Sequence, residues 1–392
     1  MSITETNTTE EKRMTESATV LTAQPTAAAD RRTTIRDLLE ELVAADGSDL
    51  HLTVGQPPKM RIDGILRDST TWADKLTPKE TIELAYSLLT EKQKRAFEVD
   101  DELDFSFGVA RLSRFRANVF RQRGAVALAI RQIPFEIRDF GGLGLPSVVE
   151  SFAERPNGMI LVTGSTGSGK STTLAALIDK INREKRLHIL TIEDPIEFIH
   201  NHRTSMVNQR EVGSDTKSFA NALKYALRQD PDVILVGEMR DPETIAAAIT
   251  MAETGHLVFA TLHSNSAAET INRIIDVFPH EQQPQIRTQL AAVLEGIITQ
   301  QLIPKKNTGR AMAAEVLVVT PAIRALVRDG KTHQIYSSMQ AGGKHGMQTM
   351  NQALFNLWLT GVSEEEEIMN HSEDHAELNR LIAQHHTNRS GR

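Results

Sequence analysis

The 392-residue sequence contains no cysteine. That absence excludes a disulfide framework, thiol catalysis and cysteine-ligated zinc, and it favours a reducing compartment such as the cytosol. Long apolar runs are missing too, since none approaches the roughly 18 residues that span a membrane, and no secretory leader is recognisable before Arg31. A basic excess is also lacking, because 44 Lys and Arg stand against 51 Asp and Glu, a net charge of −7. We therefore expect a cytoplasmic protein without direct membrane insertion and without a nucleic-acid partner.

The length predicts two or three domains, and the first half of the chain indicates a small α+β domain. Residues 1–33 are rich in Thr, Ala and Glu without helical periodicity, which predicts a disordered tail. Residues 34–133 combine short strand-like runs with an apolar stripe at helical spacing, for which Thr34 is the expected N-cap. The stripe consists of Ile35, Leu38, Leu39, Leu42 and Val43. Residues 134–146 carry three glycines and two prolines between two periodic regions, so we interpret them as a linker.

The second half, residues 147–362, has the pattern of an α/β domain. Apolar runs alternate with helical periods, and the runs are MILVTG, LHILTI, DVILVG, HLVFATL and AEVLVVT. Near-continuous runs of β-branched residues are typical of a parallel sheet that helices cover on both faces. The acidic, polar residues 363–392 predict a C-terminal tail with a surface helix and a frayed end.

Residues 164–171 match the phosphate-binding pattern G-x-x-x-x-G-K-[ST]. An apolar strand precedes the loop and a helical period follows it, so backbone N–H groups and a positive helix end face the phosphates. Lys170 is expected to bridge the β- and γ-phosphates of ATP and the Ser171 hydroxyl to ligate Mg²⁺. A flexible Gly/Ser loop is the alternative interpretation. The predicted nucleotide-binding residues are Gly164, Ser165, Thr166, Gly167, Ser168, Gly169, Lys170, Ser171 and Thr172.

Acidic residues follow two other apolar runs. Glu238 ends the segment 233–238, and Glu197 closes the segment Glu-Asp-Pro-Ile-Glu after LHILTI. We expect both at the sheet edge that carries the phosphate loop, where one could polarise the attacking water while the other serves Mg²⁺. We favour Glu197 as the base and Glu238 as the metal ligand. For Glu238, a solvated glutamate at a strand end is the alternative.

Two histidines bracket the run 257–262. His263 follows the run, where a sensor of the γ-phosphate would stand. His256 precedes it, and its pattern fits a structural role as well as a catalytic one. A single histidine in a sequence is more often structural than catalytic, so these two remain hypotheses.

Six arginines and no acidic residue occur between positions 111 and 131. In R-F-R-A-N-V-F they alternate with apolar residues, which predicts a half-buried strand with one cationic face. That face is either simply solvated or lies against the nucleotide and supplies arginine fingers, each worth about 10³–10⁵ in rate.

Four segments together resemble the secretion ATPase superfamily. They are G-S-T-G-S-G-K-S, T-I-E-D-P-I-E-F, D-P-D-V-I-L-V-G-E-M-R-D and G-H-L-V-F-A-T-L-H-S-N-S, which correspond to the Walker A motif, Asp box, Walker B motif and His box. Within the superfamily the chain resembles the type IV pilus retraction ATPases in D-L-H-L-T-V-G-Q-P-P, A-I-R-A-L-V-R-D-G and G-M-Q-T-M-N-Q-A-L. One departure is Ser165, where the family usually has proline.

The resemblance implies a PAS-like N-terminal domain joined to a RecA-like P-loop ATPase domain. It implies a homohexamer at the cytoplasmic face of the inner membrane, which hydrolyses ATP to withdraw the pilus through an inner-membrane platform protein. By position it makes Glu197 and Glu238 essential acids, and His256 and His263 the His box. It makes Arg116, Arg123 and Arg131 candidate phosphate-reaching arginines, and Ala322, Ile323 and Arg324 residues that couple hydrolysis to retraction.

Three other functions remain open. A pilus assembly or type II secretion ATPase is disfavoured because those enzymes carry a zinc-binding Cys₄ insertion that a cysteine-free chain cannot build. A RecA-like nucleic-acid motor predicts hydrolysis that polynucleotides stimulate. A regulatory paralogue would bind ATP but turn it over too slowly to drive motion.

Overall fold

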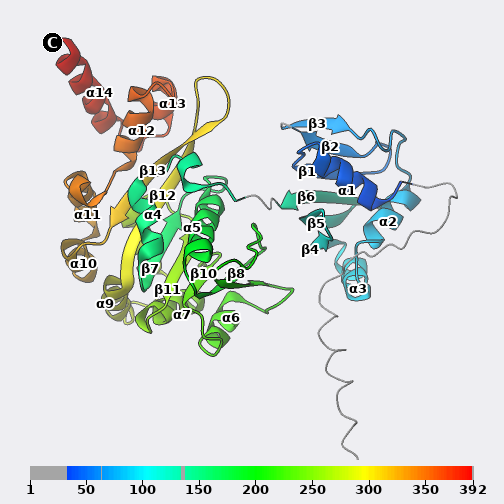
Figure 1. Ribbon diagram of the computed structural model, residues 1–392, viewed down its shortest axis with the longest axis horizontal. Helices are drawn as coiled ribbons and strands as arrows, with labels where there is room; N and C mark the ends of the chain where they lie inside the picture. The colour runs from blue at the N-terminus through cyan, green and yellow to red at the C-terminus, as the bar shows by residue number, and fades with distance from the viewer. Residues whose placement is uncertain (1–32, 63, 134–136, 391–392) are drawn as a thin grey trace, which may run out of the picture. The chain divides into compact units, whose positions relative to one another are not determined.

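Two β-sheets, one in each half of the chain, organise this protein (Figure 1). The computed structural model describes residues 33–62, 64–133 and 137–390. The chain divides into two compact units, residues 1–135 and 136–392. The predicted tail, apart from residue 33, lies outside the described residues, as do residues 134–136 of the predicted linker.

The first unit is an antiparallel sheet of six strands in the order β3-β2-β1-β6-β5-β4. Helices α1, α2 and α3 each begin at a threonine whose hydroxyl accepts a backbone N–H bond, and Thr34 caps α1 as predicted. The α+β character of this unit is therefore confirmed. Its elements are α1 (Ile35–Ala44), β1 (Asp49–Leu52), β2 (Lys59–Ile62), β3 (Ile65–Asp68), α2 (Pro78–Tyr86), α3 (Glu91–Asp100), β4 (Glu102–Val109), β5 (Ser113–Gln122) and β6 (Ala125–Ile133).

The second unit is built on a sheet of seven strands in the order β13-β12-β7-β11-β10-β8-β9. Its elements are α4 (Ser147–Ser151), β7 (Gly158–Thr163), α5 (Lys170–Glu184), β8 (His188–Glu193), β9 (Met206–Glu211), α6 (Phe219–Ala226), β10 (Val233–Val236), α7 (Pro242–Glu253), β11 (Leu257–Leu262), α8 (Ala267–Asp276), α9 (Gln283–Val293), β12 (Leu294–Pro304), β13 (Arg310–Val318), α10 (Pro321–Arg328), α11 (Ile335–Gln340), α12 (Met350–Leu359), α13 (Glu365–Asn370) and α14 (His375–Ser390). Short 3₁₀ turns occupy Phe140–Gly142, Phe152–Glu154, Thr332–Gln334 and Gly343–His345.

All five predicted apolar runs form strands, and six of the seven strands are parallel. The expectation of a parallel sheet was wrong for the run AEVLVVT, because β13 pairs antiparallel with β12. A connection of five residues, 305–309, joins the two strands, and so short a link permits only an antiparallel pair. Strands β9 and β12 were not predicted, since polar residues such as Gln300 interrupt their runs.

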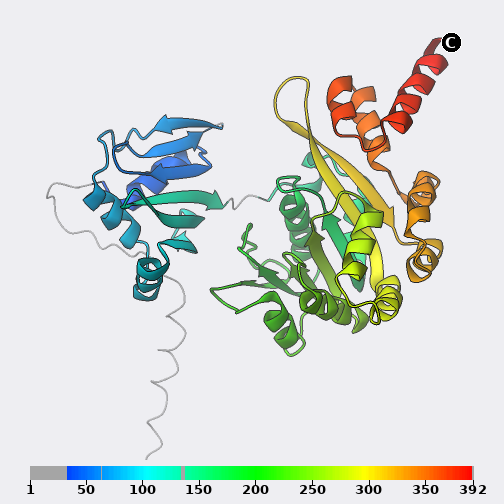
Figure 2. The same cartoon turned by 180° about the vertical axis from the view of Figure 1, so that it is seen from behind.

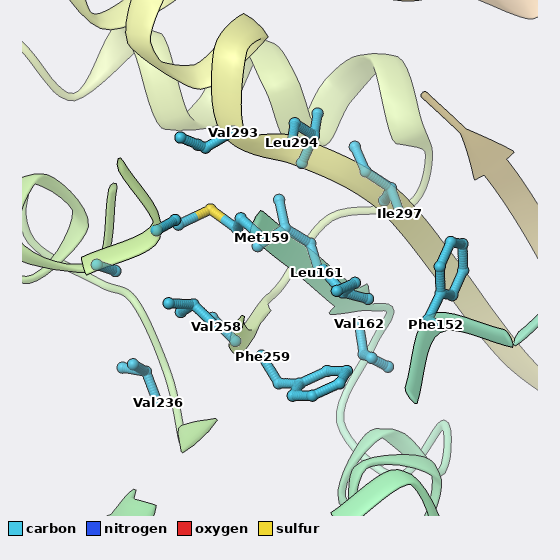
Figure 3. Close-up of a cluster of buried hydrophobic side chains, with 14 of the residues drawn as sticks. Phe152, Met159, Leu161, Val162, Val236, Val258, Phe259, Val293, Leu294 and Ile297 are labelled. Carbon is cyan, nitrogen blue, oxygen red and sulfur yellow. The ribbon is translucent and has the colours of Figure 1, made fainter. Parts of the chain in front are cut away.

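Strands β7, β10 and β11 have every residue buried, as expected of central strands covered on both faces (Figures 1 and 2). Figure 3 shows part of this core, in which Phe152 lies near Ile297 of β12. A Cβ atom at Gly296 would stand 2.3 Å from the Phe152 ring, so this position has room only for glycine. The packed core fixes the relative positions of the strand ends that carry the candidate site.

The segment 363–392, predicted as an acidic tail, contains the two helices α13 and α14. Their buried residues Ile368, Leu378 and Ile382 form a small apolar cluster with α12 and the β12–β13 hairpin. Sequence periodicity missed this packing because the acidic residues of α13 dominate its composition. Within the described ranges, no helix is both long enough and apolar enough to cross a membrane.

Candidate functional site

The loop between β7 and α5 has the backbone of a phosphate cradle. Gly164 has φ +136°, and a Cβ there would lie 2.4 Å from the carbonyl oxygen of Gln300 and 2.6 Å from Ser168 Oγ. Gly169, with φ +93°, is the N-cap of α5 and offers no side-chain cap. The first N–H groups of α5, from Lys170 onward through Ser171 and Thr172, are therefore left for an anion.

Lys170 and Ser168 both carry polar groups that a bound phosphate could contact. The Lys170 Nζ donates to the carbonyl oxygens of Gly164 (2.8 Å) and Ser165 (3.0 Å) of its own loop. Burial lowers the pKa of Lys170, while the charges of Glu238 and Glu197 oppose that shift. Ser168 is buried, and its Oγ has no hydrogen-bond partner among the described residues. A phosphate would satisfy both groups.

The strand order brings the predicted acid Glu238 to the loop. Strand β11 lies between β7 and β10, so the carboxyl ends of all three meet at one edge. The backbone beside Glu238 is fixed on both sides, since Gly237 N donates to Ile192 O (2.8 Å) and Met239 N to Thr261 O (3.0 Å). A Cβ at Gly237 would come within 3.1 Å of the backbone of β8, which explains the glycine inserted before the acid.

Glu238 is held between two basic side chains. Its Oε1 lies 3.3 Å from His263 Nε2, and its Oε2 lies 2.7 Å from a guanidinium nitrogen of Arg240. Burial favours the neutral acid, but Arg240, His263 and Lys170 outweigh it and hold the pKa of Glu238 below its ordinary value. Glu238 is therefore a carboxylate at neutral pH, the form needed for a metal ligand or a base.

A pocket of about 520 Å³ opens beside these residues. It connects the phosphate loop, the acid and three basic side chains, and its lining residues are Thr166, Glu238, Met239, Arg240, Ile245, Leu262, His263, Arg273 and Val277. The Arg273 guanidinium donates to the carbonyl oxygen of His263 (2.5 Å) and so braces the segment that presents the histidine. The pocket is polar enough to hold the charged end of a nucleotide.

Glu197 is presented by a loop that the buried Glu193 anchors. Glu193 accepts hydrogen bonds from Thr191 Oγ1 (2.6 Å), Gln209 Nε2 (3.3 Å) and the backbone N–H of Glu197 (3.3 Å). Burial raises the pKa of Glu193 despite these bonds. Glu197 itself is exposed, and its charge acts on Lys170. Both predicted acids thus lie at the Lys170 edge of the sheet.

His256 lies at the other end of β11 from His263. Six strand residues at about 3.3 Å each separate the two histidines by roughly 20 Å. The His256 ring nitrogen Nδ1 lies 2.9 Å from Met251 O and 3.1 Å from Thr254 Oγ1, at the end of α7. The structure therefore brings His263 to the phosphate loop and does not bring His256 there.

The three predicted arginines of the first unit are not all together either. Arg116 and Arg131 face each other directly across β5 and β6, and Arg131 pairs with Asp49 at 2.8 Å. Like charges directly opposite each other are unfavourable unless an anion lies near. Arg123, with φ +50°, forms the β5–β6 turn with Gly124, at the far end of the hairpin. The predicted alternation of β5, with one buried and one cationic face, is confirmed.

The predicted coupling residues Ala322, Ile323 and Arg324 lie in α10. Ile323 is buried and Ala322 is exposed. Arg324 donates to the carbonyl oxygens of Ala291 and Ala292 (both 2.7 Å) at the end of α9, and it also pairs with Glu295. This arginine therefore stabilises the C-terminus of a neighbouring helix, away from the phosphate loop.

Sequence reasoning missed two basic residues of this site. Arg240 stands two positions after Glu238, so its place in the motif could have drawn attention to it. Arg273 reaches the site only because α8 folds back along the sheet, and no local signal marks it. Among the described residues, no group of three or more His, Asp or Glu side chains could hold a metal without further ligands.

Comparisons with known proteins agree with this arrangement. Residues 127–370 match the family described as type II/IV secretion system protein. The type IV pilus retraction ATPase PilT of Pseudomonas aeruginosa is 48% identical over 328 residues, which cover 84% of this chain and 95% of that protein. A twitching motility protein of Neisseria gonorrhoeae is 46% identical over 306 residues, 78% of this chain and 81% of that protein.

A solved structure extends the likeness to three dimensions. The crystal structure of the pilus retraction motor PilT with bound ADP has 52% identity and a TM-score of 0.84, and it covers 89% of this chain and 100% of that one. The chain therefore belongs to the type II/IV secretion system protein family, and it is a nucleotide-binding ATPase. Within that family it is a member of the pilus retraction ATPases.

Proposed function

We propose that this protein is the ATP-hydrolysing motor that powers type IV pilus retraction, and thereby twitching motility. The main support for this proposal is that a phosphate loop without a helix cap lies at the same sheet edge as Glu238 and His263. The high identity to retraction ATPases over almost their whole length supports the mechanical output. The nucleotide-binding residues are those of the loop, Gly164 to Thr172.

Mg²⁺ is the metal that fits this site best. Ser171 at the start of α5 and the carboxylate of Glu238 offer hard oxygen ligands, and phosphate oxygens and waters complete the shell that Mg²⁺ prefers. When bound, the ion neutralises charge that develops on the phosphates. Glu238, with its lowered pKa, suits the metal, and the exposed Glu197 is the favoured base that polarises the attacking water.

The working assembly in this proposal is a homohexamer at the cytoplasmic face of the inner membrane, acting on a platform protein of the pilus machine. Arg116, Arg123 and Arg131 are proposed to supply charge to the phosphates. The pair Arg116 and Arg131 supports this role better than Arg123, because the two residues stand directly opposite each other in the β5–β6 ladder and concentrate positive charge there, although Arg131 also pairs with Asp49. The hydrogen-bond partners of His256 lie at the end of α7, away from the phosphate loop. Its proposed role is therefore to orient the junction of α7 and β11.

Arg324 is proposed to couple hydrolysis to motion through α9 and Glu295. Since its guanidinium caps α9 and lies away from the loop, Arg324→Ala is expected to spare ATP hydrolysis and abolish retraction. Arg328→Ala on the same helix, where the arginine is 60% exposed, is the matched control. Normal twitching of the Arg324→Ala strain would refute the coupling role.

The deciding experiment compares twitching and surface pili in a strain without this protein and in one that carries Glu238→Ala. Excess pili without motility in both strains is the expected result, because assembly continues while withdrawal fails. Loss of pili would instead favour an assembly ATPase. Hydrolysis by the purified protein that rises with added polynucleotide would favour a nucleic-acid motor, and we expect none.

A further inference from the structure

Arg240 combines a fixed backbone with an exposed side chain. Met239 on one side is buried and bonded to β11, and Asp241 on the other side caps α7 by accepting from Thr244 N (2.8 Å). The Arg240 side chain is nevertheless 75% exposed. Such a side chain can change partners without any movement of the main chain.

Arg240 pairs with Glu238, the carboxylate that the proposed hydrolysis requires. The guanidinium lies 2.7 Å from Glu238 Oε2 and also within reach of the charge of Asp194. A guanidinium that stays on Glu238 would occupy an oxygen required by a metal or by a water molecule, and it would weaken the carboxylate as a base. The pair must therefore open before hydrolysis.

An alternative acceptor is available in the same pocket. Arg240 lines it together with Thr166 of the phosphate loop, so the terminal phosphate of a bound triphosphate would enter the space that the guanidinium faces. A planar guanidinium binds phosphate through two parallel N–H bonds. A triphosphate offers this group, and a diphosphate on the same loop does not.

We propose that Arg240 exchanges Glu238 for the terminal phosphate when ATP binds, so that it distinguishes ATP from ADP and frees Glu238 only when a triphosphate is present. This inference deepens the proposed function and rests on nucleotide binding at the loop. Arg240 is thus a specificity-determining residue. With ADP or with no nucleotide, it stays on Glu238.

The test measures binding rather than turnover. The full-length protein and its Arg240→Gln variant are titrated calorimetrically with ADP and with the non-hydrolysable β,γ-methylene analogue of ATP, in Mg²⁺ and again in EDTA. We expect Arg240→Gln to weaken the triphosphate analogue about 10-fold or more, as befits a charge-assisted phosphate contact, and ADP less than 2-fold. Using EDTA removes any contribution of Glu238 as a metal ligand.

Two further variants serve as controls. Arg203→Gln removes an exposed arginine that pairs with Asp179 outside the pocket, and it should change neither affinity. Arg240→Lys keeps the charge but loses the planar fork, so it should recover only part of the preference. Equal weakening of both ligands by Arg240→Gln, or no weakening of either, would overturn the proposal.

A further readout follows from the exchange itself. Glu238→Gln removes the competing carboxylate, so in EDTA it should strengthen triphosphate binding when Arg240 is present, and much less in the double variant. An equal gain in both backgrounds would contradict the exchange. Failure of the wild-type protein to bind either nucleotide would instead refute the proposed function, and the two failures are therefore distinguishable.

Discussion

Three helices begin at the same edge of the central sheet, and one of them differs from the other two. Helix α7 is capped by Asp241, and α8 is capped by Ser266 while its Ala267 N–H donates to Glu315 Oε1 (2.7 Å). Helix α5 begins at Gly169 without any side-chain cap. A side-chain cap stabilises a helix by about 1 kcal/mol. A helix without one forgoes that stability and keeps its first N–H groups open to a ligand.

The difference between these helix ends indicates where an anion binds. At α7 and α8 the chain itself satisfies the first N–H groups, and these helix ends serve stability. At α5 the N–H groups, the positive end of the helix and Lys170 remain for a ligand. The strand order then decides which neighbours the ligand meets, namely Glu238 after β10 and His263 after β11.

The largest expected effect comes from the charge at the open helix. Lys170→Ala should slow ATP hydrolysis at least about 100-fold, because it removes the cation that faces the terminal phosphates. The fold should persist, since among the described residues the Lys170 ammonium group hydrogen-bonds only to carbonyl oxygens of its own loop. Lys180→Ala on the same helix, where Nζ pairs with Glu184 at 2.8 Å, is the control and should keep near-normal turnover. Unchanged hydrolysis by the Lys170→Ala variant would refute the assignment of the phosphate site.

A second substitution fills the phosphate cradle. Gly164→Ala forces a Cβ to within 2.4 Å of Gln300 O at φ +136°, so we expect it to lower the free energy of unfolding by roughly 3 kcal/mol. Gly167→Ala, at φ +79° with nothing within 4 Å, should cost only about 1 kcal/mol. Urea unfolding of both variants checks the difference. Equal losses would mean that backbone conformation alone, and not the close approach, demands glycine.

The smallest effect concerns the closed end of α8 and depends on pH. Burial raises the pKa of Glu315 from 4.5 to about 7, although backbone N–H groups of Ala267 and Met350 favour its charged form. The folded state then keeps a proton that the unfolded state loses between these pH values, so stability falls as pH rises from about 4.5 to about 7. The loss amounts to at most about 3 kcal/mol for this group.

Glu315→Gln cannot titrate, so the variant should show a flatter dependence of the unfolding free energy on pH between 5 and 8. Denaturant unfolding at several pH values measures that slope. Glu315→Gln also loses one acceptor for two N–H donors, so the slope and not the absolute stability is the meaningful quantity. Identical slopes in the wild type and the variant would show that Glu315 is ionised throughout the range.

Much of the fold was predictable because its signals are local. Each of the five apolar runs forms a strand, and Thr34 caps the helix that begins at Ile35. The direction of β13 could not be read from its run, since a near-continuous apolar run indicates burial on both faces, and an antiparallel strand at this place in the sheet is buried in the same way. The sequence predicted a surface helix in residues 363–392, but it did not predict that α14 packs on α12, because the few apolar residues of α14 become buried only in that contact.

The candidate site shows the same division. The loop residues and Glu238 were marked by spacing, and the structure brings Glu197 to the same edge of the sheet. The roles given to these residues stay predictions until the variants above are measured. The sequence favoured His263 as a phosphate sensor and left the role of His256 open, and the two histidines stand at opposite ends of β11. Arg324 carried a motif signal, but the carbonyl groups that it caps lie about thirty residues away in the chain.

Only the tertiary structure decided that Arg240 sits on Glu238, that Arg273 braces His263 and that Glu315 closes α8. Those contacts depend on the order of the strands and on how helices fold back across them. The order is set by burial of the whole core, a property that no short stretch of sequence carries.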